Sequence, residues 1–400
     1  MIKLERPEIC CGCGACANIC AHKAISMHTD KEGFLYPVVD TTACTDCGLC
    51  ESVCPFANVE AERMPRGVFA SRNNDESVRE KSSSGGVFAM LAERTIAEGG
   101  VVFGARFAED WSVIHDHADT LEGIKLFMGS KYVQSRLGDS YIRVRKYLKE
   151  GRKVLFSGTP CQISALRKFL RKEYDNLLLV DVVCHGVPSN RVWQRYLDEL
   201  TEKSHHRRSD ICSISFRDKR NGWRNYGMAV KYSDGEEFIP MRESHYMRLF
   251  LRDLSIRPSC YECRCRSGRS GADITLADFW GANKVLKKSD DDRGISLLMV
   301  WNKKGQEMIN SLDIKVASVP YYKAFKYNTA IAISPRRPAV RDLFWQHFEQ
   351  NGAVASAHFA KQIKWSKFEK WKFSLKKAYF KTKLKLRYNE DRNCNTTSAE

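Results

Sequence analysis

Two runs of cysteine share one spacing, and this repeat constrains the fold more than any other feature of the chain. The first run, with the pattern Cys-x2-Cys-x2-Cys-x3-Cys, comprises Cys10, Cys13, Cys16 and Cys20. The second has the same pattern followed by proline and comprises Cys44, Cys47, Cys50 and Cys54. Three cysteines at this spacing let a tight loop bind three corners of a cubane 4Fe–4S cluster. The repeat therefore predicts two such clusters in a small N-terminal domain.

The ligand sets follow from the way bacterial ferredoxins use this spacing, because the fourth cysteine of each run binds the cluster of the other run. The predicted sets are Cys10, Cys13, Cys16 and Cys54 for one cluster, and Cys44, Cys47, Cys50 and Cys20 for the other. Zinc is the alternative, but structural zinc sites use two Cys-x2-Cys pairs separated by a longer loop. The pattern favours iron–sulfur. Cys11 is surplus, and we expect it to be buried without binding a cluster.

The rest of the chain is long enough for further domains, since 400 residues exceed one small core. Short β-branched runs alternate with amphipathic segments after residue 68, which is typical of an α/β domain. The expected fold class is α+β: a duplicated ferredoxin-like domain, a larger α/β domain and a basic helical tail. The expected boundaries are 1–60 for the cluster domain, 61–67 for a linker, 68–335 for the larger domain and 336–400 for the tail.

Individual elements are expected where the apolar pattern changes period. A hairpin is predicted over 28–39, with Gly33 at its turn, and a second over 101–107 and 111–118. Further strands are expected at 68–71, 153–156 and 177–183, and helices at 87–98, 162–170 and 190–200.

The chain shows no export signal, so we expect a cytoplasmic protein with reduced cysteines and no structural disulfides. Its longest apolar run, 177–183, is too short to cross a bilayer. The net charge is +17, but 361–387 alone holds ten lysines and one arginine against one glutamate. The basicity therefore belongs largely to the tail.

The tail keeps helical spacing among its apolar residues, which include Trp365, Phe368, Leu375 and Tyr379. A basic amphipathic helix of this kind can lie on the inner, anionic face of a membrane as a peripheral contact. The alternatives are an acidic protein partner or a simple cap on the fold. No nucleic acid is expected, because no recognition motif accompanies the charge.

A third cysteine group, Cys260-x2-Cys263-x1-Cys265, lies beside several arginines. It can supply three ligands of a further cluster, with the fourth from elsewhere in the chain. Cys161 and Cys184 each follow a predicted strand and are both candidates. The alternatives are a zinc site and a group of reduced cysteines that binds no metal.

A serine–glycine turn at Ser82–Gly86 opens a predicted helix, and the Gly158–Gln162 turn opens another. Small residues at a helix N-terminus let a phosphate approach free N–H groups. Ordinary helix capping explains the same residues equally well.

Six short motifs follow one another along the chain: Ser82–Gly86, Gly129–Ser135, Gly158–Gln162, Cys184–Gly186, Ala272–Thr275 and Asp278–Gly281. This pattern resembles the coenzyme F420 hydrogenase/dehydrogenase beta-subunit family, in the branch with an N-terminal dicluster ferredoxin. The resemblance runs from Cys10 to about Asn302, and it implies an FAD in the larger domain. A flavin can exchange a hydride on one side and single electrons on the other.

Carried over by motif, the resemblance implies which residues meet the flavin. The phosphate or ribityl groups would contact Ser83, Ser84, Gly85 and Gly86, with Gly158 and Thr159 as further cofactor contacts. The isoalloxazine would be lined by Lys131, Tyr132, Gln134 and Ser135, with Lys131 as the cation beside the ring edge that becomes negative on reduction. The resemblance also supports the third cluster, for which the implied ligands are Cys260, Cys263, Cys265 and Cys161.

The expected function is an iron–sulfur flavoprotein oxidoreductase that passes electrons between a hydride carrier and the clusters. The carrier stays open between an F420-like deazaflavin, a nicotinamide and an unknown acceptor. No GxGxxG follows a predicted strand, which disfavours a separate NAD(P) domain. The alternative is a ferredoxin-like electron relay or accessory subunit without its own flavin, linked to polysaccharide biosynthesis. The expected partner is a redox protein or the hydride-carrying coenzyme.

Overall fold

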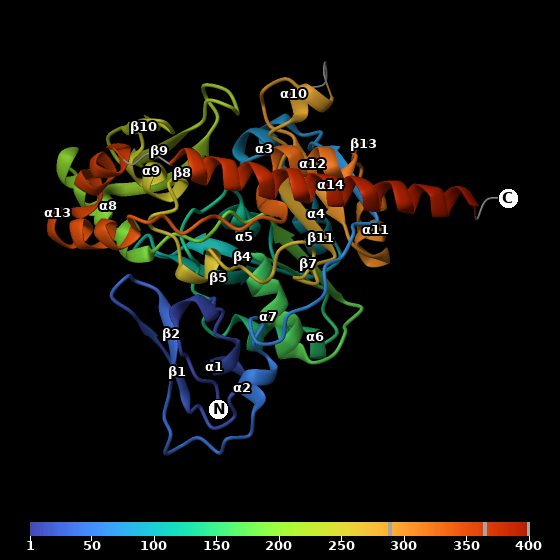
Figure 1. Ribbon diagram of the computed structural model, residues 1–400, viewed down its shortest axis with the longest axis horizontal. Coiled ribbons are helices and arrows are strands. Elements are labelled where there is room, and N and C mark those ends of the chain that lie inside the picture. The colour runs from blue at the N-terminus through green and yellow to red at the C-terminus, as the bar shows by residue number, and fades with distance from the viewer. Residues whose placement is uncertain (287–289, 363–365, 398–400) are drawn as a thin grey trace.

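The computed structural model describes residues 1–286, 290–362 and 366–397 (Figure 1). The cysteine runs lie in a small N-terminal unit at one end of the molecule. Its elements are η1 (Pro7–Ile9), α1 (Ala15–Ile19), β1 (Ile25–Thr29), β2 (Leu35–Val39) and α2 (Leu49–Ser52). β1 and β2 pair antiparallel, which confirms the first predicted hairpin and begins it three residues earlier, at Ile25. Each short helix starts at a glycine with positive φ, Gly14 or Gly48, where the backbone turns sharply after a cysteine.

The larger unit is built on an eight-stranded mixed sheet with the order β13-β3-β12-β11-β7-β6-β4-β5. Its four central strands β11, β7, β6 and β4 are parallel, and antiparallel strands flank them on both sides. The strands are β3 (Gly67–Ser71), β4 (Val101–Phe107), β5 (Val113–Ala118), β6 (Val154–Gly158), β7 (Leu177–Val182), β11 (Ile274–Asp278), β12 (Ser296–Val300) and β13 (Val316–Ser318).

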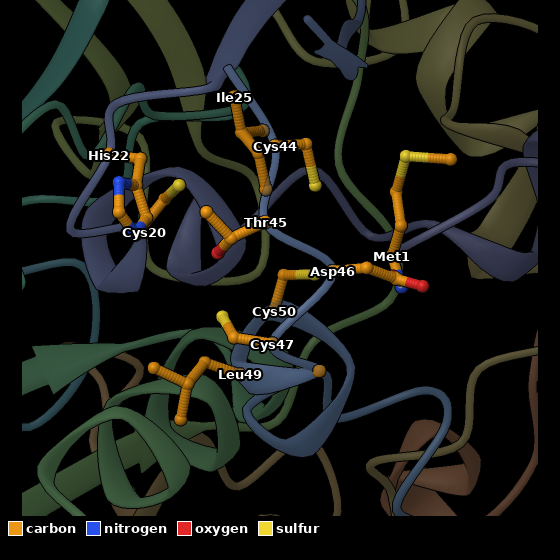
Figure 2. A pocket seen from close by; sticks show the side chains of 11 residues that line it. Met1, Cys20, His22, Ile25, Cys44, Thr45, Asp46, Cys47, Leu49 and Cys50 are labelled. Atoms are coloured by element: carbon orange, nitrogen blue, oxygen red, sulfur yellow. The ribbon is translucent and has the colours of Figure 1, made fainter. Parts of the chain in front are cut away.

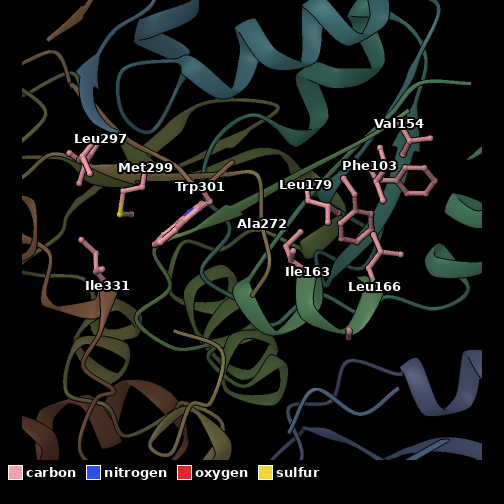
Figure 3. Packing of buried hydrophobic residues seen from close by; sticks show 14 of the residues in the cluster. Phe103, Val154, Ile163, Leu166, Leu179, Ala272, Leu297, Met299, Trp301 and Ile331 are labelled. Atoms are coloured by element: carbon pink, nitrogen blue, oxygen red, sulfur yellow. The ribbon is translucent and has the colours of Figure 1, made fainter. Parts of the chain in front are cut away.

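Helices cover both faces of this sheet, because its central strands are apolar on both sides. On one face, Phe103, Leu179 and Met299 pack against helices (Figure 3). That face is covered by α6 (Ser140–Lys149), α7 (Pro160–Leu170), α12 (Tyr321–Tyr327) and α14 (Lys367–Thr397). The other face is covered by α4 (Val87–Ala97), α5 (Leu121–Ile124), η2 (Lys125–Phe127) and α11 (Lys303–Asn310).

A second, antiparallel sheet with the order β10-β9-β8 packs against three helices through an aromatic core. Trp193, Phe216 and Tyr246 form the centre of that core. The elements are β8 (Ile211–Asp218), β9 (Gly227–Tyr232), β10 (Glu236–Pro240), α8 (Asn190–Lys203), α9 (His245–Leu251) and α13 (Arg341–Gln362). Short elements complete the chain: α3 (Glu76–Lys81), η3 (Arg208–Asp210), η4 (Pro258–Cys260), α10 (Ala282–Val285) and η6 (Thr329–Ile331).

The predicted strands and helices of the larger unit are all present, with ends that differ by a few residues. The expected linker, 61–67, is tied to the core, and its last residue, Gly67, begins β3. Arg63 donates to the carbonyls of Gly268 and Ala272. Trp365 of the tail pattern lies outside the described residues.

Ion pairs and hydrogen bonds hold the N-terminal unit against the larger one. Buried Arg341 of α13 pairs with Glu32 in the β1–β2 turn. Ser189, the N-cap of α8, donates to the carbonyl of Glu32. Apolar packing also joins the two units, since Ala15 and Val53 belong to the same buried cluster as Leu166 of α7.

None of the helices within the described ranges combines the length and apolarity needed to span a bilayer.

Candidate functional site

One group of four cysteines surrounds a cavity at the far end of the N-terminal unit, and we call it the outer site. It is lined by the first three cysteines of the second run, together with the last cysteine of the first run (Figure 2). The outer cysteines are Cys20, Cys44, Cys47 and Cys50. The backbone N–H of Ile2 donates to the Sγ of Cys50 at 3.3 Å. This set of four combines both runs.

The other four cysteines line a cavity of about 270 Å³ that faces the larger unit, and we call it the inner site. They are Cys10, Cys13, Cys16 and Cys54. Phe56 and Arg264 close the cavity on the side of the larger unit. The structure therefore brings together each of the two predicted sets of four, with Cys11 as a fifth cysteine that lines the inner cavity.

The chemistry of these sites suits a cubane cluster. The thiols of each set surround a cavity, as ligands to different corners of a cluster must. Backbone N–H groups point at the sulfurs, for example Gly12 N to Cys10 Sγ at 3.4 Å, and such bonds stabilise ligating thiolates.

A third group of thiols lies where the parallel strands of the main sheet end. Cys161 is in the first turn of α7, directly after β6, and Cys184 follows β7. Electrostatic interactions link Cys184 with Cys260, Cys161 and Cys263. Burial raises the pKa of Cys260 to about 12. We call Cys161, Cys184, Cys260 and Cys263 the core thiols.

Cys265 lies on the side of the core thiols that faces the N-terminal unit. It is buried with Cys11 and Phe56, and its neighbours are Cys161 and Cys263 of the core thiols as well as Cys13 and Cys54 of the inner site. Cys11 is buried, as expected, and its thiol hydrogen-bonds with both Cys13 and Cys161. That contact lowers the pKa of Cys161. A continuous set of sulfur atoms thus connects the inner site with the core thiols.

The serine–glycine turn uses most of its polar groups to hold itself in place. Ser82 Oγ donates to the Val78 carbonyl and Ser84 Oγ donates to the Ile295 carbonyl. Gly85 lies against β3 and β12, where an added Cβ would come within 2.6 Å of backbone atoms. Gly86 is the N-cap of α4, with φ at 81° and no side-chain cap. No side chain therefore caps α4, and Gly86 is buried beside Asn73 and Ser82.

Ser83 is the member of the turn that reaches the second predicted cofactor segment. Its Oγ accepts a hydrogen bond from Ser130 N at 2.6 Å, and its carbonyl accepts one from Trp223 Nε1 at 3.2 Å. Lys131, by contrast, donates from Nζ to the carbonyls of Leu126 and Met128 in its own loop. Burial lowers the pKa of this ammonium to about 7.

A cation and an aromatic platform beside this segment were not predicted from the sequence. Buried Arg217 donates to Asp278 at 2.7 Å and to the hydroxyl of Tyr132 at 3.3 Å, while its buried Nε has no partner. Burial opposes its charge, but Asp278 raises the pKa of the guanidinium above its usual value. Its guanidinium lies 4.9 Å from the ring centre of Trp280, which stacks on Trp223 and is 38% exposed.

The sequence contains only weak indications of a role for Trp280 and Arg217. Trp280 lies in the Asp278–Gly281 string that supports the family resemblance, yet its ring was not assigned a role. Arg217 belongs to a different sheet, on β8, and nothing in its local sequence links it to Asp278 at the end of β11.

The remaining predicted cofactor residues lie between this platform and the core thiols. Gln134 Nε2 donates to the Cys11 carbonyl at 3.0 Å. Ser135 Oγ lies 2.9 Å from both His115 Nδ1 and Gln162 Nε2. Burial lowers the pKa of His115 to about 4, so its imidazole is neutral. Thr159 Oγ1 lies 3.2 Å from Cys161 Sγ, and Gly158 ends β6 just before it.

Comparison with known proteins supports both parts of this arrangement. Residues 9–58 match the family model of the 4Fe-4S dicluster domain. Residues 151–319 match the model that describes the C terminus of the coenzyme F420 hydrogenase/dehydrogenase beta subunit. The family resemblance is thereby confirmed over these two segments. The comparison with curated proteins gives no match.

Among solved structures, a similar chain occurs in the F420-reducing [NiFe] hydrogenase complex from Methanosarcina barkeri, a xenon derivative. It is 16% identical, and the match covers 75% of this chain and 93% of that chain with a TM-score of 0.43. A likeness at that level supports no residue-by-residue transfer.

Proposed function

Because the chain joins a 4Fe-4S dicluster domain to a region of the coenzyme F420 hydrogenase/dehydrogenase beta-subunit family, we propose that it is an iron–sulfur flavoprotein oxidoreductase. The observation that carries the proposal is the order of its thiol groups. The outer site, the inner site and the core thiols follow one another from the tip of the N-terminal unit to the edge of the main sheet. Such an order suits single-electron transfer into or out of a buried cofactor.

The cluster ligands are assigned to these three groups. The outer and inner sites would each hold one 4Fe–4S cluster, and the core thiols would hold a third. Arg266 supports the third assignment, because it is buried, anchored to the carbonyl of His185, and hydrogen-bonded to Cys263. A fixed cation beside a thiol favours its ligating, anionic form.

The flavin is assigned to the region between Ser83 and Trp280. FAD, when bound, supplies exchange between a hydride and single electrons. The N-terminus of α4, which no side chain caps, suits a diphosphate, since its N–H groups lie at the positive end of the helix. Arg217 has an unpartnered Nε that suits a carbonyl or ring nitrogen, and the exposed part of Trp280 suits contact with a flat ring.

Replacing Trp280 with alanine is expected to weaken FAD binding by about five- to tenfold, the loss that one stacking contact accounts for. Fluorescence titration of the reconstituted chain measures this. Trp371→Ala is the matched control, because Trp371 is an exposed tryptophan on α14. Equal affinity of the Trp280 variant and the wild type would place the flavin elsewhere.

The partner is proposed to be a redox protein or a hydride-carrying coenzyme, for which an F420-like deazaflavin and a nicotinamide are both candidates. The competing function is an electron relay without flavin, or an accessory subunit in polysaccharide biosynthesis. Anaerobic purification with assay of iron, sulfide and flavin separates these. About twelve iron atoms with about one FAD per chain supports the oxidoreductase. About eight iron atoms, with no flavin after reconstitution, supports the relay.

We also propose that α14 rests on an anionic membrane surface. One side of the helix packs on the core through Phe373, Phe380 and Leu384, with Phe380 against Phe325. The opposite side carries five apolar residues that are each half or more exposed: Phe368, Trp371, Leu375, Tyr379 and Leu386. Lysines flank this stripe on both sides. An apolar stripe between rows of lysine suits the boundary of an anionic bilayer.

Vesicle flotation tests this surface. The chain is expected to float with phosphatidylserine-containing vesicles but not with pure phosphatidylcholine, and the binding should weaken as salt screens the lysines. Leu375→Glu is expected to reduce the bound fraction severalfold. Leu343→Glu is the control, because Leu343 is equally exposed but lies on α13. Undiminished binding of the Leu375 variant would exclude the stripe as the contact.

A further inference from the structure

A buried arginine lies where the inner site meets the larger unit. Arg257 is 1% exposed. Its Nε donates to the Cys10 carbonyl at 2.8 Å and its Nη2 donates to the Leu35 carbonyl at 2.9 Å. Its Nη1 donates to Gln134 Oε1 at 3.2 Å. The guanidinium is therefore fixed on both the N-terminal and the larger unit.

None of these partners is a carboxylate. In a protein interior an unpaired charge is costly, so a buried arginine normally has an anionic partner. The guanidinium also lies 4.2 Å from the ring centre of Tyr36. This cation–π contact offsets the buried positive charge only in part. The remaining contact is from Nη2 to Cys10 Sγ at 3.7 Å. A cysteine that ligates iron is a thiolate, and this sulfur then supplies the missing negative charge.

The cysteine loop is shaped to admit this cation. Gly12 has φ at 69°, and a Cβ at this position would lie 2.5 Å from Arg257 Nη1. Any larger residue would push the guanidinium away from Cys10. Glycine here therefore provides both the left-handed turn and the close approach of the arginine.

The outer site has no comparable buried cation among the residues that line it. Its nearby cation is the amino group of Met1, which is exposed and pairs with Asp46. Asp46 offsets that charge, and Cys47 is exposed to water. The two sites therefore differ in charge and burial although their cysteine spacing is the same.

We propose that Arg257 holds the inner site at a higher reduction potential than the outer site. This inference rests on the proposed function. Positive charge and N–H···S hydrogen bonds stabilise the reduced cluster, which is the more negative state. A single electron shared by the two sites then resides mainly on the inner one, next to the core thiols. Arg257 thus sets the direction in which the N-terminal unit delivers electrons.

Redox titration of the anaerobically purified full chain, followed by electron paramagnetic resonance, tests this. In Arg257→Gln, the ratio of reduced to oxidised inner cluster at a fixed potential is expected to fall tenfold or more, which equals 59 mV or more for one electron. The outer cluster is expected to keep its potential. Arg257→Lys keeps the charge and is expected to shift less than Arg257→Gln.

Arg341→Gln is the matched control, because Arg341 is a buried arginine at the same interface that pairs with Glu32 rather than with a cysteine. If both glutamine variants shift the inner potential equally, loosening of the interface explains the effect and the proposal fails. It also fails if Arg257→Gln leaves the potential unchanged.

The order of potentials can also be measured without changing Arg257. Cys20→Ser and Cys54→Ser chains, each left with one N-terminal cluster, give the two potentials separately. An inner potential at or below the outer one would overturn the inference even if Arg257→Gln does not assemble. Absence of both clusters from the wild-type chain would instead refute the proposed function.

Discussion

Replacing Cys54 with serine is expected to remove the cluster of the first cysteine run and to spare that of the second. Cys54 belongs to the second run in sequence, but it lines the inner cavity with Cys10 and Cys13. The iron content should fall by about four atoms per chain. The inner cluster loses a thiolate, whereas the outer cluster keeps all four of its own.

A pair of double variants identifies which cluster remains. Adding Cys13→Ser to Cys54→Ser should cost no further iron, because both residues belong to the inner site. Adding Cys47→Ser should remove the remaining N-terminal cluster. Cys212→Ser is the control, because Cys212 is an exposed thiol on β8. The reverse pattern would mean that each run binds its own cluster.

Replacing Cys184 with serine is expected to abolish the third cluster, with a loss of about four iron atoms per chain. Cys184 interacts with Cys260, Cys161 and Cys263, whereas Cys265 interacts with Cys161 and Cys263 and also with Cys13 and Cys54 of the inner site. We propose Cys184 rather than Cys265 as the fourth ligand, because Cys265 also borders the inner site. The Cys265→Ser variant should retain the iron of the third cluster.

Iron assay together with Mössbauer spectroscopy of both variants measures the outcome. The N-terminal clusters should be unaffected by Cys184→Ser, since neither cavity is lined by that residue. Iron loss in Cys265→Ser with full retention in Cys184→Ser would restore the ligand set that the resemblance implied. Full retention in both, together with loss in Cys161→Ser, would require a different fourth ligand.

The sequence by itself determined the local features of this protein. The spacing of Cys10 to Cys20 and of Cys44 to Cys54 is sufficient to predict how each loop can bind a cluster, because those ligands are neighbours along the chain. Strands β3 to β7 and helices α4, α7 and α8 were likewise predictable, since their period and caps are properties of short segments.

Only the tertiary structure decided which distant residues meet. The approach of Arg257 to Cys10, the contact of Arg217 with Asp278 and the grouping of Cys184 with Cys260 each join segments from different elements. The turn of Lys131 toward its own loop was equally unpredictable from the motif. The local sequence limits the chemistry that a residue can perform, but tertiary packing decides which charge, sulfur or ring the residue contacts. Those neighbours come from distant parts of the chain, and only the folded core brings them together.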